Sequence, residues 1–122
     1  MILANTDKEI TLIYYSKEHV GKQILAYAKT ENIPIHEIDL VHTKLTPSQW
    51  VGISSKMGIE IKELVNMEDP DYKEKFGETN QLSEQDWLTL LVHNPDILKA
   101  PIVMKEDKIV FMSNPQDMLH FS

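Results

Sequence analysis

Residues 10–40 read ITLIYYSKEHVGKQILAYAKTENIPIHEIDL and carry three successive secondary-structure patterns. The first six residues are rich in β-branched and aromatic side chains, which predicts a buried strand. Val20, Ile24 and Ala28 then recur at helical spacing, which predicts an amphipathic helix. Apolar and polar residues alternate over 33–40, which predicts a second strand. A strand, a helix and a strand with short joints indicate a right-handed parallel unit.

The middle of the chain carries repeated helix-start signals. Thr46-Pro47, Asp69-Pro70 and Ser83 each offer a side chain that can accept hydrogen bonds from the free amides of a first turn. Gly58 is placed to end the first of these helices. We therefore expect a helical insertion over about residues 46–98.

After this insertion, the chain returns to strand patterns. Apolar runs over 101–104 and 108–112, joined by residues 105–107, predict an antiparallel hairpin, and Asn114-Pro115 starts a last short helix. The order is thus β-α-β, a helical insertion, and β-β-α. This order predicts an α/β fold (α+β in some schemes) with a mixed four-stranded sheet, in a single domain spanning residues 1–122.

Cysteine and arginine are absent from the whole sequence, and each absence excludes a kind of site. There is no cysteine, which removes disulfides, thiolate nucleophiles and sulfur-ligated metals. All 12 basic residues are lysine, so no arginine is present to grip an oxyanion with two parallel hydrogen bonds. The scattered lysines and a net charge of −7 argue against nucleic acid as a partner.

The sequence also predicts where the protein is found. No run of about 18 apolar residues is present, and residues 1–8 lack the basic start and apolar stretch of a signal peptide. We expect a cytoplasmic protein with no membrane partner.

Several short motifs, in a fixed order, resemble those of a known family. They are Ile13-Tyr14 before a helix, Lys56-Met57-Gly58-Ile59, Asp69-Pro70-Asp71-Tyr72-Lys73, His93-Asn94-Pro95-Asp96-Ile97-Leu98 and Ala100-Pro101-Ile102-Val103. The chain resembles the arsenate reductase/Spx (ArsC-like) branch of the thioredoxin superfamily, whose corresponding motifs include "LG(L/I)", "EPxYK", "HPxLI" and "RPIV". The resemblance covers nearly the whole chain and implies a thioredoxin-like fold.

The same resemblance shows where this chain departs from the family pattern. His19 stands where the family has its catalytic cysteine, and Lys22 stands where relatives have cysteine or serine. Ala100 and Asn114 stand where arginines are expected. Because imidazole cannot form the mixed disulfide on which that chemistry depends, we expect a divergent member without arsenate reductase activity. Pro101 matches the family's cis-proline.

Two functions from different classes remain open. The first is a noncatalytic binding or regulatory module that holds a protein or peptide, as Spx relatives act through protein contacts. The second is a low-specificity enzyme that binds glutathione or another thiol and uses His19 as a base, although glutathione binding is the weaker expectation. The binding module would use a remnant groove or the acidic side of the insertion, and the enzyme would use the same groove. We favour the module, and therefore expect no catalytic residue and no cofactor. The residues of this groove are Tyr15, His19, Lys22, Ala100 and Pro101.

Two charged clusters complete the candidates. His36, Asp39 and His42 suggest a metal site, but strand spacing puts His36 and Asp39 on opposite faces, so we expect none. Carboxylates give the insertion an acidic side, which we interpret as a solvated face, with a basic partner as the alternative. These carboxylates belong to Glu60, Glu63, Glu68, Asp69, Asp71 and Glu74.

Overall fold

The computed structural model describes residues 9–77 and 82–121. The chain divides into two compact units. One is built from Met1–Lys44 together with Ala100–Ser122, and the other from Leu45–Lys99. We call them the sheet unit and the helical unit, and describe each by itself.

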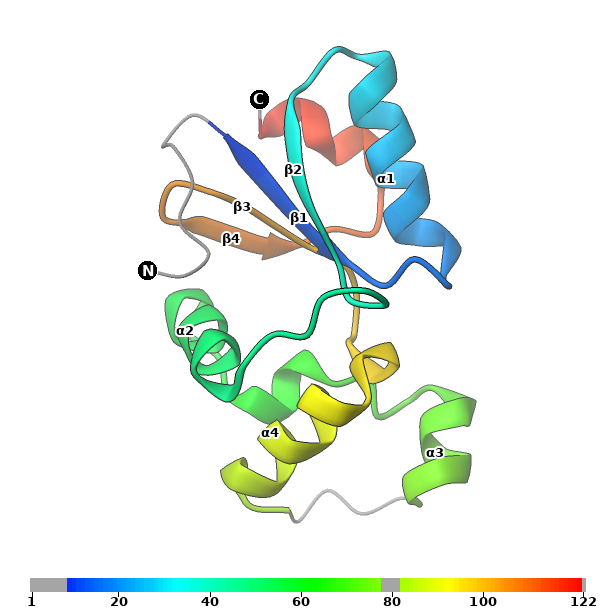
Figure 1. Cartoon of the computed structure of the whole chain (residues 1–122), viewed down its shortest axis with the longest axis vertical. Coiled ribbons are helices and arrows are strands. Elements are labelled where there is room, and N and C mark those ends of the chain that lie inside the picture. Colours follow the sequence, from blue (N-terminus) through cyan, green and yellow to red (C-terminus); the bar gives the residue numbers. More distant parts are fainter. Residues whose placement is uncertain (1–8, 78–81, 122) are drawn as a thin grey trace. The chain divides into compact units, whose positions relative to one another are not determined.

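The sheet unit contains a four-stranded mixed sheet with the order β2-β1-β3-β4 (Figure 1). Strands β1 and β2 are parallel, whereas β1 with β3 and β3 with β4 are antiparallel. This arrangement confirms the predicted fold class. The strands are β1 (Ile10–Tyr14), β2 (Ile35–Asp39), β3 (Ile102–Lys105) and β4 (Lys108–Phe111).

One face of this sheet is covered by α1 (His19–Thr30) and the 3-10 helix η3 (Pro115–His120), which lie on the same side in Figure 1. Alternate residues of β1 point to that face, as strand geometry requires, and join apolar side chains of both helices. Each large apolar side chain buried in this way contributes about 1.5–3 kcal/mol. The buried cluster consists of Ile10, Leu12, Tyr14, Ile24, Ala28, Val103, Met112, Met118 and Phe121.

Two predicted segments differ in detail from the structure. The hairpin turn is one residue shorter than predicted, because Lys105 still pairs with Lys108 and Glu106 turns the chain with φ of 56°. The last helix is 3-10 rather than α. The Asn114 side chain caps it as predicted, by accepting a hydrogen bond from the amide of Gln116 at 3.0 Å.

The helical unit begins its helices where the capping residues predict. The Thr46 hydroxyl accepts from the Gln49 amide at 3.2 Å, and the Gln49 side chain accepts from the Thr46 amide at 2.8 Å. Ser83 and Asp86 form the same reciprocal pair, and each cap of this kind is worth about 1 kcal/mol. The helices are α2 (Pro47–Met57), η1 (Ile61–Leu64), α3 (Pro70–Phe76), α4 (Glu84–His93) and η2 (Pro95–Ile97).

Two tryptophans are the largest side chains in the core of the helical unit. Trp50 on α2 and Trp87 on α4 are 1% and 2% exposed. The Trp87 ring stacks on Tyr72 of α3, with ring centroids 6.4 Å apart and planes at 21°. An isolated bridge between Val65 and Leu98 joins the segment after η1 to the segment after η2.

Candidate functional site

The candidate site lies in the sheet unit, where the loop after β1 leads into α1. Tyr15 follows β1 directly and is half-buried, whereas Lys17 and Glu18 are exposed. The backbone amide of Glu18 donates to the Tyr15 carbonyl at 3.0 Å, which closes a tight turn before the helix. The loop therefore turns tightly, with Lys17 and Glu18 exposed to solvent.

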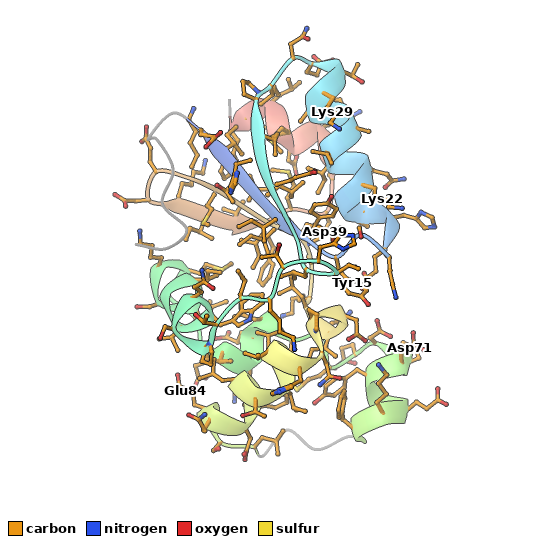
Figure 2. The ribbon with its side chains drawn as sticks, viewed as in Figure 1. Tyr15, Lys22, Lys29, Asp39, Asp71 and Glu84 are labelled. Carbon is orange, nitrogen blue, oxygen red and sulfur yellow. The ribbon has the colours of Figure 1, made fainter. Side chains whose placement is uncertain are left out.

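A carboxylate from the neighbouring strand holds this loop. Asp39 ends β2, and its Oδ1 atom accepts from the amide of Ser16 at 3.1 Å and from the amide of Val41 at 3.0 Å. Its Oδ2 atom lies 3.8 Å from Nε2 of His42. Figure 2 shows Asp39 and Tyr15 at this end of the sheet, with Lys22 on α1. Asp39 thus joins the loops that follow two parallel strands.

The contacts of Asp39 favour its charged form. Burial, the largest single effect, would raise the pKa of this carboxyl. Hydrogen bonds from the Ser16 side chain, from the amides of Val41 and Ser16, and the charge of His42 act in the opposite direction and prevail. The pKa of Asp39 is therefore lowered, and the anchor is an ionised carboxylate at neutral pH.

Tyr14 lies beside this anchor, at the end of β1. Its hydroxyl donates to Oε2 of Glu37 at 3.2 Å. Burial, followed by the charges of Glu37 and Asp39, raises the pKa of Tyr14 to about 12. Tyr14 therefore stays neutral, and with the hydroxyl already bonded to Glu37 we assign it a structural role.

His19 and Lys22 lie on the first turn of α1 and are both exposed. They are three residues apart, so their side chains project from the same side of the helix. The Glu18 side chain makes no capping hydrogen bond to this first turn. Position 19 is thus a solvent-accessible imidazole at the first residue of a helix.

The other two predicted residues enter from β3. Ala100 and Pro101 directly precede β3, which pairs with β1 through Ile13 and Ile102. Continuing that antiparallel register brings both residues to the end of the sheet where Tyr15 lies. All five predicted residues therefore gather at one end of the sheet unit, although no hydrogen bond joins any two of them within the described residues.

The structure differs from the resemblance at Pro101. No cis peptide bond occurs in residues 9–77 and 82–121, so the bond before Pro101 is trans. The Pro101 carbonyl accepts from the amide of Met112 at 2.8 Å, which extends the β3–β4 pairing by one step. This carbonyl is thus engaged by the protein's own sheet.

The metal hypothesis gains no support from these contacts. Over the described parts of the chain, no three His, Cys, Asp or Glu side chains are grouped so that they could hold a metal ion. His36 is exposed on β2, and one oxygen of Asp39 is already bonded to two backbone amides.

Sequence reasoning missed Asp39 as the anchor. It also missed Gly21 of α1, which lies so close to Tyr14 of β1 that an added Cβ atom would clash with the tyrosine side chain. The only sequence signal for Asp39 is its place at the carboxyl end of a predicted strand, where parallel strands bring loops together. For Gly21, the signal is a glycine in the first turns of a predicted helix, where it costs stability and so has a packing reason.

The fold, and the place of His19 at the start of the first helix after a parallel strand, define a thioredoxin-like domain. The ArsC family model matches residues 6–121. The chain therefore belongs to the ArsC family, as a member without cysteine.

Solved structures agree with this fold. The chain is similar to the arsenate reductase from Vibrio cholerae, with a TM-score of 0.78 and 17% identity over 94% of this chain and 98% of that chain. An arsenate reductase (ArsC) related protein from Brucella melitensis gives a TM-score of 0.67 and 11% identity, over 97% of this chain and 98% of that chain. A Staphylococcus aureus protein solved by NMR gives a TM-score of 0.68 and 22% identity, over 89% of this chain and 96% of that chain.

No curated protein matches the chain at a significant level. In the part of the chain that the structure describes, no helix is both long and apolar enough to cross a lipid bilayer.

Proposed function

We propose that this chain is a noncatalytic binding module that keeps the ArsC scaffold and holds a protein or peptide partner at the surface around position 19. The observation that carries the proposal is the exposed His19 at the first residue of α1, in a chain that contains no cysteine. Without a thiol there is no atom to form a mixed disulfide or a thiol-arsenate adduct.

The scaffold around His19 nevertheless keeps a fixed shape. The loop before α1 is held by the carboxylate of Asp39 through the amides of Ser16 and Val41. A surface held in one conformation loses less entropy when a partner binds. Such a surface suits recognition even though it lacks a nucleophile.

The kind of partner follows from the charges. Lys22 and Lys17 flank His19 on the exposed side, and no arginine is present for bidentate recognition of phosphate. The net charge of −7 disfavours nucleic acids and anionic membranes. A protein or peptide, met in the cytoplasm, is the partner that we propose.

An affinity capture from cells that natively make this chain tests the proposal. The wild type is compared with a His19→Ala, Lys22→Ala double variant, and with Lys29→Ala as a matched control further along α1 (Figure 2). We expect one protein to be retained by the wild type and the control but not by the double variant. Equal retention by all three chains would contradict the proposal.

A calorimetric titration with reduced glutathione separates the alternative. We expect no heat beyond dilution, because the chain offers neither a thiol nor an arginine for the peptide's carboxylates. Saturable binding that is lost in the double variant would replace the proposed module with a thiol-binding enzyme.

A further inference from the structure

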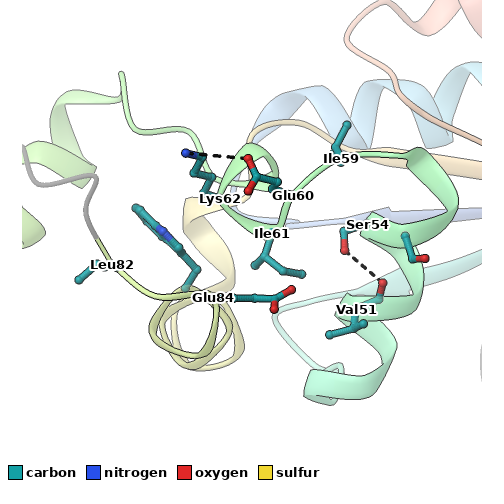
Figure 3. A pocket seen from close by; sticks show the side chains of 10 residues that line it. Val51, Ser54, Ile59, Glu60, Ile61, Lys62, Leu82 and Glu84 are labelled. Carbon is teal, nitrogen blue, oxygen red and sulfur yellow. Dashed lines mark hydrogen bonds and ion pairs between the residues drawn. The ribbon is translucent and has the colours of Figure 1, made fainter.

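The helical unit has a hollow of its own, of about 460 Å³, between α2, η1 and the start of α4 (Figure 3). All of its lining residues belong to the helical unit, and none is among the residues around His19. The lining residues are Val51, Ser54, Ser55, Ile59, Glu60, Ile61, Lys62, Leu82, Glu84 and Trp87.

The floor of this hollow is apolar. Val51 is 40% exposed and Ile59 is half-buried, and both line the hollow. Ile61 and Trp87 are almost fully buried. An occupant with a hydrocarbon portion would remove the exposed part of this surface from water and gain about 25 cal/mol for each Å² covered.

Trp87 lines the hollow with its ring and carries a buried hydrogen-bond donor, the indole Nε1, that is unpaired among the described residues. An unpaired buried donor costs about 1–3 kcal/mol. Because the Trp87 ring lines the hollow, its indole signal reports on an occupant that contacts the ring.

The rim of the hollow adds an unpaired negative charge. Glu60 is 3.9 Å from Nζ of Lys62 and is thus partly neutralised. Glu84 has no ion pair among the residues that the structure describes. Figure 3 shows its carboxylate extending from the start of α4 towards Val51, beside Ile61.

The segment that contains the hollow also has a net negative charge. Residues 45–99 contain ten of the 19 acidic residues but only five of the 12 lysines. A positively charged group would therefore be attracted towards this unit before it meets Glu84.

We propose that this hollow binds a lysine or arginine side chain presented by a partner protein. The aliphatic stem would lie on Val51 and Ile59, as long basic side chains commonly cover apolar surface. The charged head would pair with Glu84. This site shares no residue with the position-19 surface, so each proposal can fail without the other.

The test is an NMR titration of the full chain with Nα-acetyl-lysine methylamide and Nα-acetyl-arginine methylamide. Nα-acetyl-norleucine methylamide is the uncharged comparison, because it keeps the stem without the charge. We expect saturable shifts of the Trp87 indole signal with both basic probes. The Trp50 indole, assigned through a Trp50→Phe variant, serves as an internal control, since Trp50 is 1% exposed and does not line the hollow.

A matched pair of variants tests the role of the charge. Glu84→Gln should weaken binding of the lysine probe about fivefold, as expected for an exposed ion pair. Asp71→Asn removes another exposed first-turn carboxylate, on α3, that does not line the hollow, and should leave the affinity unchanged. The proposal is overturned if norleucine binds as well as lysine, if both variants behave alike, or if the shifts centre on His19 and Lys22.

Discussion

Gly21 of α1 lies against Tyr14 of β1 so closely that a Cβ atom on Gly21 would be 2.5 Å from the Cβ of Tyr14 and 2.6 Å from its Cδ2. Contacts of this length do not occur between real side chains. The first turns of α1 can therefore pack on β1 only because residue 21 has no side chain. This approach sets the position of His19, two residues earlier.

Replacing Gly21 with alanine should destabilise the protein. The new methyl group would force apart α1 and β1, and such overpacking costs about 1–3 kcal/mol, more than the gain of about 1 kcal/mol from the better helix former. Gly52, in α2, is the matched control, because nothing lies within 4 Å of its added Cβ. Gly52→Ala should stabilise by roughly 0.5–1 kcal/mol. Urea unfolding measures the stability of both variants. Equal changes in the free energy of unfolding would contradict the close packing of Gly21 on Tyr14.

Asp39→Asn should loosen the loop before α1 and change the response to acid. The lowered pKa of Asp39 means that its contribution to the free energy of unfolding is present above the unfolded pKa, near 3.8. It is lost as the pH falls below that value and through the folded pKa. At pH 7 we expect the variant to be less stable by about 1 kcal/mol.

The difference between the wild type and Asp39→Asn should therefore hold from neutral pH down to the unfolded pKa near 3.8, and shrink as the pH falls further through the folded pKa. Denaturant unfolding at a series of pH values measures it. A difference that does not shrink below the unfolded pKa would show that the charge of Asp39 does not act as described.

Much of the fold could be predicted because its signals are local. Thr46 and Ser83 each cap a helix through a partner three residues away, and these contacts recur in any fold. The role of Asp39 could not be predicted in this way, because its partner Ser16 is 23 residues distant. The need for a glycine at position 21 likewise depends on Tyr14, which belongs to another element.

Tyr72→Phe should not destabilise the helical unit, although it alters a residue that is 2% exposed. The Tyr72 hydroxyl is buried without a hydrogen-bond partner among the described residues. Its removal therefore eliminates the free-energy cost of burying an unpaired polar group. The ring remains to stack on Trp87. We expect a change between zero and about 1 kcal/mol in favour of the variant, measured by urea unfolding. A loss of more than about 1 kcal/mol would reveal a partner for this hydroxyl.

His19→Cys should produce a thiol of unusual acidity. The first residue of a 12-residue helix lies at the positive end of the helix dipole, which stabilises a thiolate. Lys29→Cys, in the last turn of the same helix, is the matched control. We expect a pKa at position 19 about one unit or more below that at position 29. Iodoacetamide reactivity as a function of pH gives both pKa values. Identical values would contradict the expectation that the start of α1 stabilises a thiolate.

The central claim is that the surface around position 19 now serves binding. Its most direct test places the photo-crosslinking residue p-benzoylphenylalanine at position 19, and in a second chain at position 29, in cells that natively make the protein. The proposed function predicts a light-dependent covalent adduct with one protein at position 19, and little or none at position 29. Adducts of equal yield at both positions, or none at position 19, would contradict it.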